Sequence, residues 1–355
     1  MPTVSVDTFF ACSLMIIVVL SAMGATSKIL NPYIENSETP NLQQKYSEVS
    51  KHLLLYTGEP SGWGRDSGAL PTQFGLADED HRTPYELEMD KVSRLNSLNS
   101  FAVDYASVLQ AVGLPDTTFQ LQIKPVFNVA ISLAGTFVDS LNTTYTFQTI
   151  TEKDGASVPA YLKYYIVANG EAGSYEPEFS RGTLFFNVTL FNSISYSALL
   201  VVFARQVYSN AATSYGTFRF EHGASTSFPD GTFLGLSPLN RTLDVSVVYP
   251  GVLLSDVYAF TFDYSSVLVQ TRNGSQSAEY DIKRFVGTSP TVVVSTGWNS
   301  TVSFAEWVSY PQVPLLFGAG IQSSHSLSDD YAFSFPVTID SVLYDCTIWL
   351  GGPVD

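Results

Sequence analysis

The first strong pattern in the chain is an apolar run near its N-terminus. The 20 residues between Asp7 and Lys28 carry no charge and include the sequence FFACSLMIIVVLSAMGA. As an α-helix this run would be about 30 Å long, which matches the hydrocarbon core of a bilayer. The pattern therefore predicts an N-terminal membrane-spanning helix within residues 1–30.

Two other interpretations of this run stay open. Small residues at Ala22, Gly24 and Ala25 are typical of the cleavage region of a secretory signal peptide, although no basic residue precedes the run. A plain anchor is the other interpretation, and its orientation is weakly determined because the segment MPTVSVD contains no Lys or Arg. The interpretations differ in whether residues 1–30 remain in the mature protein.

Helix signals continue over residues 31–116, which are predicted to form a helical neck with a long loop. Asn41 is a suitable N-cap for a first helix, and the capping-box sequence TPYE at 83–86 predicts a second helix that ends near Asn96. A third helix is predicted to begin near Phe101 and to close at Gly113. The Gly- and Pro-rich residues between the first two helices are expected to form the loop.

From Thr118 onward the pattern changes to that of β-strands. Runs such as FQLQIKP, FNVAISLAG and TYTFQTIT alternate apolar and polar residues, and turn residues such as Asp154-Gly155 separate them. This pattern predicts a β-sandwich at 117–208 and a second all-β domain at 209–355. The expected fold class is α+β: an N-terminal membrane-spanning helix and helical neck, followed by mainly antiparallel β-sandwich (Ig-like) domains.

Composition and charge narrow the possible partners. Hydrophobic residues make up 45% of the 355 residues, so the chain can bury a core, and only 14% are charged against roughly 25% in average soluble domains. A net charge of -16 repels phosphate backbones and excludes a general nucleic-acid partner. With two cysteines, Cys12 in the apolar run and Cys346 near the C-terminus, a disulfide scaffold is excluded.

The chain lacks the local signatures of common enzymes. Gly-x-Ser-x-Gly, Ser-x-x-Lys, His-Glu-x-x-His, Gly-x-x-x-x-Gly-Lys and Cys-x-x-Cys are all absent. The four histidines are isolated in sequence, and the acidic clusters at 78–80 and 329–330 are expected to be solvated loops. We therefore predict no enzyme activity, no catalytic residue, no cofactor and no metal site.

The β region carries five Asn-x-Ser/Thr sequons, whereas the predicted neck carries none. Such sequons accept N-linked glycans on the surface of exported proteins. Their positions fit a region that lies outside the cell. The predicted glycosylation sites are Asn142, Asn187, Asn240, Asn273 and Asn299.

Three segments resemble archaeal type IV pilin-like surface proteins. They are Thr3-Val4-Ser5-Val6-Asp7 ahead of the apolar run, LLLYTGEPSGWG at 53–64 and LPTQFGLA at 70–77. The resemblance implies processing after Pro2, which would make Asp7 the fifth residue and an assembly residue that finds a partner in a neighbouring subunit. In the alternative interpretation Asp7 lies in the headgroup region. The stretches DGASVPAYLKYYIV, RGTLFFNVTL and YSALLVVFAR resemble Ig-like modules of surface proteins.

These observations together predict a non-enzymatic extracellular surface protein. It would be a pilin-like filament subunit or a filament-associated component, held at the cell membrane by its N-terminal helix and displaying β domains for adhesion or structure. One alternative is a monomeric membrane-anchored adhesin or envelope protein. Another is a secreted carbohydrate-binding module or enzyme, released by signal-peptide cleavage near Ala25.

Overall fold

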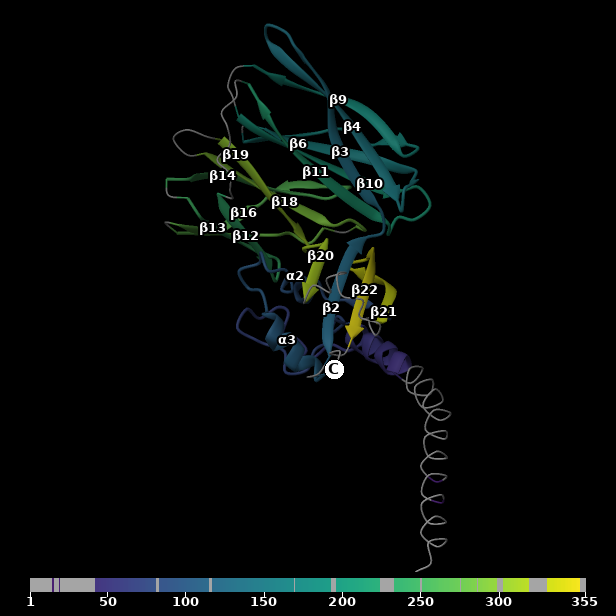
Figure 1. The fold of residues 1–355 in the computed structure, drawn as a ribbon. Helices are drawn as coiled ribbons and strands as arrows, with labels where there is room; N and C mark the ends of the chain where they lie inside the picture. Colours follow the sequence, from purple (N-terminus) through teal and green to yellow (C-terminus); the bar gives the residue numbers. More distant parts are fainter. Residues whose placement is uncertain are drawn as a thin grey trace, which may run out of the picture. The chain divides into compact units, whose positions relative to one another are not determined.

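The computed structural model describes most of the chain beyond the N-terminal segment (Figure 1). The chain divides into two compact units, Met1–Lys51 and His52–Asp355. Helical residues at 42–55 run across the division. The described residues are Met15, Val19, 42–80, 83–114, 117–168, 170–192, 196–223, 233–249, 251–274, 276–285, 287–298, 303–318 and 331–351.

The predicted α+β class is wrong, because strands dominate the described residues. These residues form 22 strands, whereas their helices are the segment 42–55 and the short α2 (Met89–Ser93) and α3 (Tyr105–Val112). Within the described part of the chain, no helix combines the length and apolar character needed to cross a membrane. The predicted helix within 1–30 lies outside the described residues, apart from Met15 and Val19, which are helical.

The predicted helical neck is also wrong in its second helix. Residues Glu86–Leu87 form strand β1, which pairs in parallel with Thr338 and Ile339 of β21. The capping box assigned Glu86 and Leu87 to a helix. They form a strand instead, because they pair with a strand far along the sequence. The helix begins only at Met89, where the Glu88 side chain accepts hydrogen bonds from the amides of Asp90 and Lys91.

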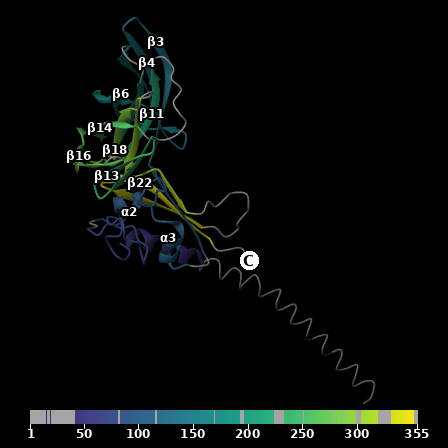
Figure 2. The same cartoon turned by 90° about the vertical axis from the view of Figure 1, so that its left-hand side faces the viewer.

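One sheet joins segments from both ends of the unit His52–Asp355 (Figure 2). Strand β2 pairs with β22 from Thr118 opposite Gly351 to Pro125 opposite Tyr344. The chain between β2 and β20 builds the other four sheets. This sheet has the order β1-β21-β22-β2-β20, with β21 at Tyr331–Ile339, β22 at Val342–Gly351, β2 at Thr118–Pro125 and β20 at Leu315–Gly318.

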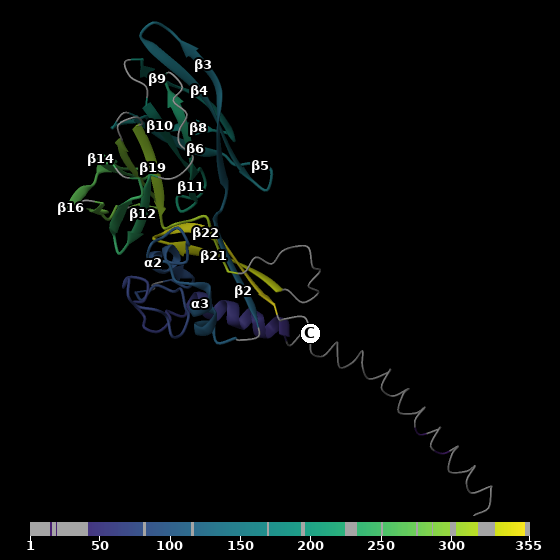
Figure 3. The ribbon, with the colours of Figure 1, turned by 60° about the vertical axis from the view of Figure 1, so that its left-hand side comes forward.

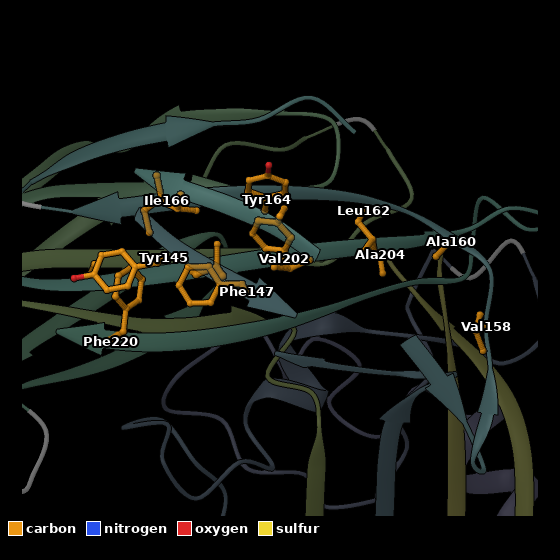
Figure 4. Packing of buried hydrophobic residues seen from close by; sticks show 14 of the residues in the cluster. Tyr145, Phe147, Val158, Ala160, Leu162, Tyr164, Ile166, Val202, Ala204 and Phe220 are labelled. Atoms are coloured by element: carbon orange, nitrogen blue, oxygen red, sulfur yellow. The ribbon is translucent and has the colours of Figure 1, made fainter. Parts of the chain in front are cut away.

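Two further sheets form the first sandwich (Figure 3). Phe147, Tyr164 and Phe220 are buried between them, together with the small residues Ala160 and Ala204 (Figure 4). The outer sheet contains β3 (Asn128–Val138), β4 (Asn142–Lys153), β5 (Ala156–Ser157) and β9 (Thr183–Phe191). The inner sheet contains β6 (Ala160–Ala168), β7 (Glu171–Ser174), β8 (Glu178–Ser180), β10 (Tyr196–Gln206) and β11 (Thr213–His222).

The second sandwich is built in the same way. Leu243, Val293 and Phe304 are completely or almost completely buried in its core. Its outer sheet contains β12 (Leu234–Leu239), β13 (Thr242–Val247), β16 (Val269–Asn273) and β17 (Ser277–Asp281). Its inner sheet contains β14 (Leu253–Phe260), β15 (Ser265–Val267), β18 (Thr291–Trp298) and β19 (Ser303–Tyr310).

The two inner sheets pack against each other and so are buried on both faces. Successive strand residues point to opposite faces. In β6, Tyr164 points into the first sandwich, whereas its neighbour Tyr165 packs against Phe260 of β14. Val294 of β18 and Val201 of β10 belong to the same inter-sandwich core. Four sheets are thus stacked through three apolar layers.

One part of the fold prediction is confirmed: the chain beyond Thr118 forms packed antiparallel sheets. The predicted hairpin turn at Asp154-Gly155 is present, with φ of 50° and 79°. Strand pairing does not test where independently folding domains begin, so the boundaries at 116/117 and 208/209 stay predictions. The Ig-like topology stays a prediction as well.

Candidate functional site

The predicted glycosylation residues are dispersed over the sheets. Asn187 is exposed on β9, where its Oδ1 accepts a hydrogen bond from Thr146 Oγ1 at 2.8 Å. Asn142 opens β4 and is half-buried, whereas Asn240 and Asn273 are exposed at a turn and at the end of β16. Glycosylation of these residues stays a prediction. Asp7 and Asn299, also predicted as site residues, lie outside the described residues.

Among the described residues, His52, His222, Cys346 and the acidic residues at 78–80 do not gather in one place, whereas Cys12, His81, His325 and the acidic pair at 329–330 lie outside the described residues. His222 is buried, with Nδ1 3.0 Å from Tyr145 Oη and Nε2 2.8 Å from the Phe191 carbonyl oxygen. Cys346 is a buried free thiol whose pKa burial raises to about 12, which makes it unreactive at neutral pH. Over the described residues, no three His, Cys, Asp or Glu side chains converge as a metal site would require.

Among the described residues, the densest group of buried charges surrounds α2, and sequence reasoning missed it. We call Glu88, Asp90, Lys91 and Arg94 the α2 charge cluster, and each of these residues is at most 4% exposed. Buried charges are costly unless hydrogen bonds and opposite charges compensate them. The sequence carried one signal: EMDKVSR places four charged residues within seven positions of a chain with few charges.

The two basic side chains of the cluster donate to main-chain carbonyl groups. Lys91 Nζ lies 2.7 Å from the Thr57 carbonyl oxygen and 2.8 Å from that of Ala77. Arg94 donates to the carbonyl groups of Phe101, Trp63, Asp66 and Ser67. Its guanidinium also lies over the ring of the fully buried Trp63. These bonds fix the loop that precedes α2.

The motifs at 53–64 and 70–77, which carry the resemblance to pilin-like proteins, enclose this cluster. Trp63 Nε1 donates to the Gly75 carbonyl oxygen at 3.2 Å, and the Trp63 ring packs against Phe74. A Cβ atom at Gly64 would overlap Glu88 Oε2, so this position requires glycine. In this structure both motifs pack around α2.

Asp90 connects the cluster to the second sandwich. Its Oδ1 accepts hydrogen bonds from Tyr310 Oη at 2.6 Å and from the Asn240 amide at 2.8 Å. Beside it, Asn99 Nδ2 donates to Gln312 Oε1 at 2.8 Å and to the Pro238 carbonyl oxygen at 3.1 Å. The contact between α2 and the second sandwich therefore combines these polar bonds with Met89, which packs against the core of that sandwich.

Both acidic groups of the cluster, and also Lys91, have shifted pKa values. Burial, together with the neighbouring Asp90, raises the pKa of Glu88 to about 7, and burial also raises the pKa of Asp90. Burial lowers the pKa of Lys91 to about 8, against the attraction of Glu88. Such shifts are typical of catalytic groups and also of buried structural networks.

The pKa of Glu88 predicts a pH dependence of stability. Because this pKa rises from 4.5 in the unfolded chain to about 7, the folded state holds the proton more tightly. The stabilisation is therefore present below pH 4.5 and is lost as the pH rises to about 7. We expect Glu88 to lower the free energy of unfolding by up to about 3 kcal/mol across this window.

The measurement is denaturant unfolding at several pH values in this window. Glu88→Gln should remove this part of the pH dependence, whereas Glu59→Gln, at an exposed position, should leave it unchanged. Identical pH profiles for the wild type and Glu88→Gln would contradict the role assigned to Glu88.

A cleft of about 410 Å³ lies next to the cluster. Arg65 and Phe101 contribute to one side, and Asp244 and Glu279 contribute from the paired strands β13 and β17. Burial and Glu279 raise the pKa of Asp244, and Arg272 pairs with Glu279 at 2.8 Å. The cleft is lined by an aromatic residue, an arginine and three acidic residues, the third being Asp66, and could take a small polar molecule. The sequon residue Asn240 is part of its lining.

Comparisons with known proteins do not identify a family. No family model matches the chain, and no curated protein matches it. Among solved structures, a crystal structure of the YadV chaperone is similar over 51% of this chain and 99% of its own. The TM-score of that match is 0.17 and the sequence identity is 8%, so the likeness carries no argument.

Proposed function

We propose that this chain is a non-enzymatic extracellular surface protein that serves adhesion or structure. In this proposal it is a pilin-like filament subunit or a filament-associated component. The observation that carries the proposal is the stack of four sheets, in which both inner sheets are buried on both faces. Such close-packed layers form a rigid body that holds its outer surfaces in fixed positions.

The bonding of the α2 charge cluster supports a structural role. Lys91 and Arg94 donate to carbonyl groups of the chain, and Asp90 accepts from Tyr310 and the Asn240 amide. A general acid or base must instead reach a proton on a substrate. The shifted pKa values of this cluster are therefore explained by burial within a structural network.

The surface chemistry of the outer sheets supports a location outside the cell. Asn187 and Asn273 are exposed sequon residues on different sheets, and the outer face around Asn187 carries Thr144, Thr146 and Thr189. N-linked glycans at such positions would project from the sheets without disturbing the core. Assembly through Asp7 is part of the same proposal and derives from the N-terminal sequence.

The experiment compares native cells that carry the wild type, Asp7→Ala or Asp7→Glu. An antibody against the β region should label intact wild-type cells, and sheared cells should release filaments that contain the protein. Asp7→Ala should abolish the filaments while the protein level stays constant, and Asp7→Glu should retain them because it keeps the carboxylate.

Two outcomes would contradict this proposal. Labelling only after the cells are broken open would refute the surface location. Unchanged filaments in Asp7→Ala would refute the assembly role of Asp7. Glycopeptide mass spectrometry of the same material should find glycan on at least one of Asn187 and Asn273.

A further inference from the structure

The outer sheet of the first sandwich has two strand edges without a pairing partner among the described residues. Strand β4 pairs with β3 on one side and with β9 on the other. Strand β9 pairs with no other described strand, and β3 contacts β11 by packing, with the Val129 carbonyl oxygen close to Gly216. The β3–β4 hairpin is visible in Figures 1 and 3, and β9 follows β4 up to its turn, where the Asn192 amide donates to the Leu141 carbonyl oxygen.

Both edges expose large apolar side chains. On β3, Phe137 is 70% exposed and Val138 is 65% exposed. On β9, Phe185 is 57% exposed and Phe191 is 73% exposed. Exposed apolar residues therefore follow both edges, and Phe185 lies well away from the hairpin tip.

Both edge strands lack charged residues and proline, two of the features that prevent free edges from pairing with other chains. Natural proteins protect such edges with charged residues or proline. The 11 residues of β3 and the nine residues of β9 include no charged residue and no proline, in a chain of net charge -16. One register shift, between Leu133 and Gly135, interrupts β3 and leaves Phe137 and Val138 beyond it. Neither strand adds charge repulsion between two copies of this acidic protein.

The directions of the two edges favour pairing between copies. Strands β3 and β9 run parallel to each other, because each is antiparallel to β4. A second copy displaced along the sheet in the same orientation would place its β3 beside β9 of the first. Such a head-to-tail contact leaves one edge free at each end of the pair, so it can continue.

A strand of another copy suits these edges better than a lipid surface does. The outward-facing backbone N–H and C=O groups of an edge need hydrogen-bond partners, and hydrocarbon offers none. The outer face next to the edges mixes polar and apolar groups, because Thr144 lies opposite Thr189 on one side and opposite Phe137 on the other. A neighbouring strand edge satisfies the backbone groups and covers the apolar side chains together.

We infer that copies of this chain associate head to tail by pairing the β9 edge of one copy with the β3 edge of the next, which extends the outer sheet across molecules. The inference rests on the strand edges alone and goes beyond the proposed surface role. It requires no assembly through Asp7.

The test uses the full chain with charges placed on one edge at a time. Phe185→Lys alters the β9 edge and Phe137→Lys alters the β3 edge, both at exposed positions. Gln148→Lys adds the same charge to the central strand β4 and is the matched control. Sedimentation velocity over a range of protein concentrations measures assembly, and thermal unfolding shows whether each variant is folded.

The head-to-tail arrangement makes a specific forecast for mixtures. The wild type and Gln148→Lys should form species larger than a dimer, whereas each edge variant alone should be monomeric. An equimolar mixture of the two edge variants should form dimers and nothing larger, because each variant retains the edge that the other lacks. Amides of β3 and β9 should exchange hydrogen more slowly in the assembled wild type than in either variant.

Each other result would overturn the inference. Dimers of Phe185→Lys alone would show a two-fold β3–β3 contact, and assembly of both edge variants would show a contact elsewhere on the chain. A monomeric wild type that binds phosphatidylcholine vesicles through Phe137 would show a lipid surface to be the partner. A monomeric wild type without vesicle binding would show that these edges stay unpaired.

Discussion

Replacing Arg94 with methionine is expected to lower the free energy of unfolding by about 3–5 kcal/mol, as breaking a buried charge network does. Methionine keeps the unbranched shape of the side chain but removes every donor. The carbonyl groups of Phe101 and Ser67 would then lose the partner that Arg94 provides, and that of Asp66 would keep only the Ala69 amide. The stacking of the guanidinium over Trp63 would be lost as well.

Denaturant unfolding followed by circular dichroism measures this change. The matched control is Arg272→Met, because the Arg272 side chain is 69% exposed and its ion-pair partner Glu279 is 35% exposed. Exposed ion pairs contribute at most about 1 kcal/mol, so the control should be nearly neutral. Equal losses for the two variants would contradict the structural role assigned to Arg94.

Replacing Phe260 with alanine is expected to destabilise the contact between the two sandwiches by about 3–5 kcal/mol. Phe260 is completely buried, and its ring stacks on that of Tyr165 with centroids 4.6 Å apart. The substitution would leave a cavity in the apolar layer between the two inner sheets, because well-packed neighbours collapse only in part.

Hydrogen exchange both measures the loss of stability in Phe260→Ala and locates it in the fold. Amides of β6, β10, β14 and β18, which line the contact, should lose protection first in Phe260→Ala. Phe179→Ala is the control, because Phe179 is 48% exposed and contacts Tyr161 at the surface. A loss in Phe260→Ala no larger than in the control would mean that the sandwiches do not stabilise each other.

The burial of the inner sheets explains a feature of the sequence that pattern reasoning left ambiguous. The outer strand β4 alternates buried and half-buried residues, as a strand with one solvated face does. The inner strand β10 instead has eight consecutive buried residues, Ser197 to Ala204. A continuous apolar run predicts a strand buried on both faces, but it does not say which sheet covers the second face.

Some turns were likewise predictable from the local sequence, whereas others depend on the pairing of the strands around them. Asp154-Gly155 was predictable, because glycine adopts positive φ without strain. The turns at Asn240-Arg241 and Asp340-Ser341 also hold both residues at positive φ, between 46° and 67°. No glycine marks these turns, and long strands on either side hold them in place. Pairing over the whole hairpin therefore decided what the local sequence left open.

The sequence by itself determined that the chain beyond Thr118 forms packed antiparallel sheets, because alternation with period two is a local property of strands. It also determined the acidic charge and the positions of the sequons. Only the tertiary structure decided that Glu86 and Leu87 pair with β21, that Asp90 meets Tyr310, and that β2 and β22 share a sheet. These contacts join residues more than 200 positions apart, and the free energy of burying and pairing them outweighs local helix signals such as TPYE.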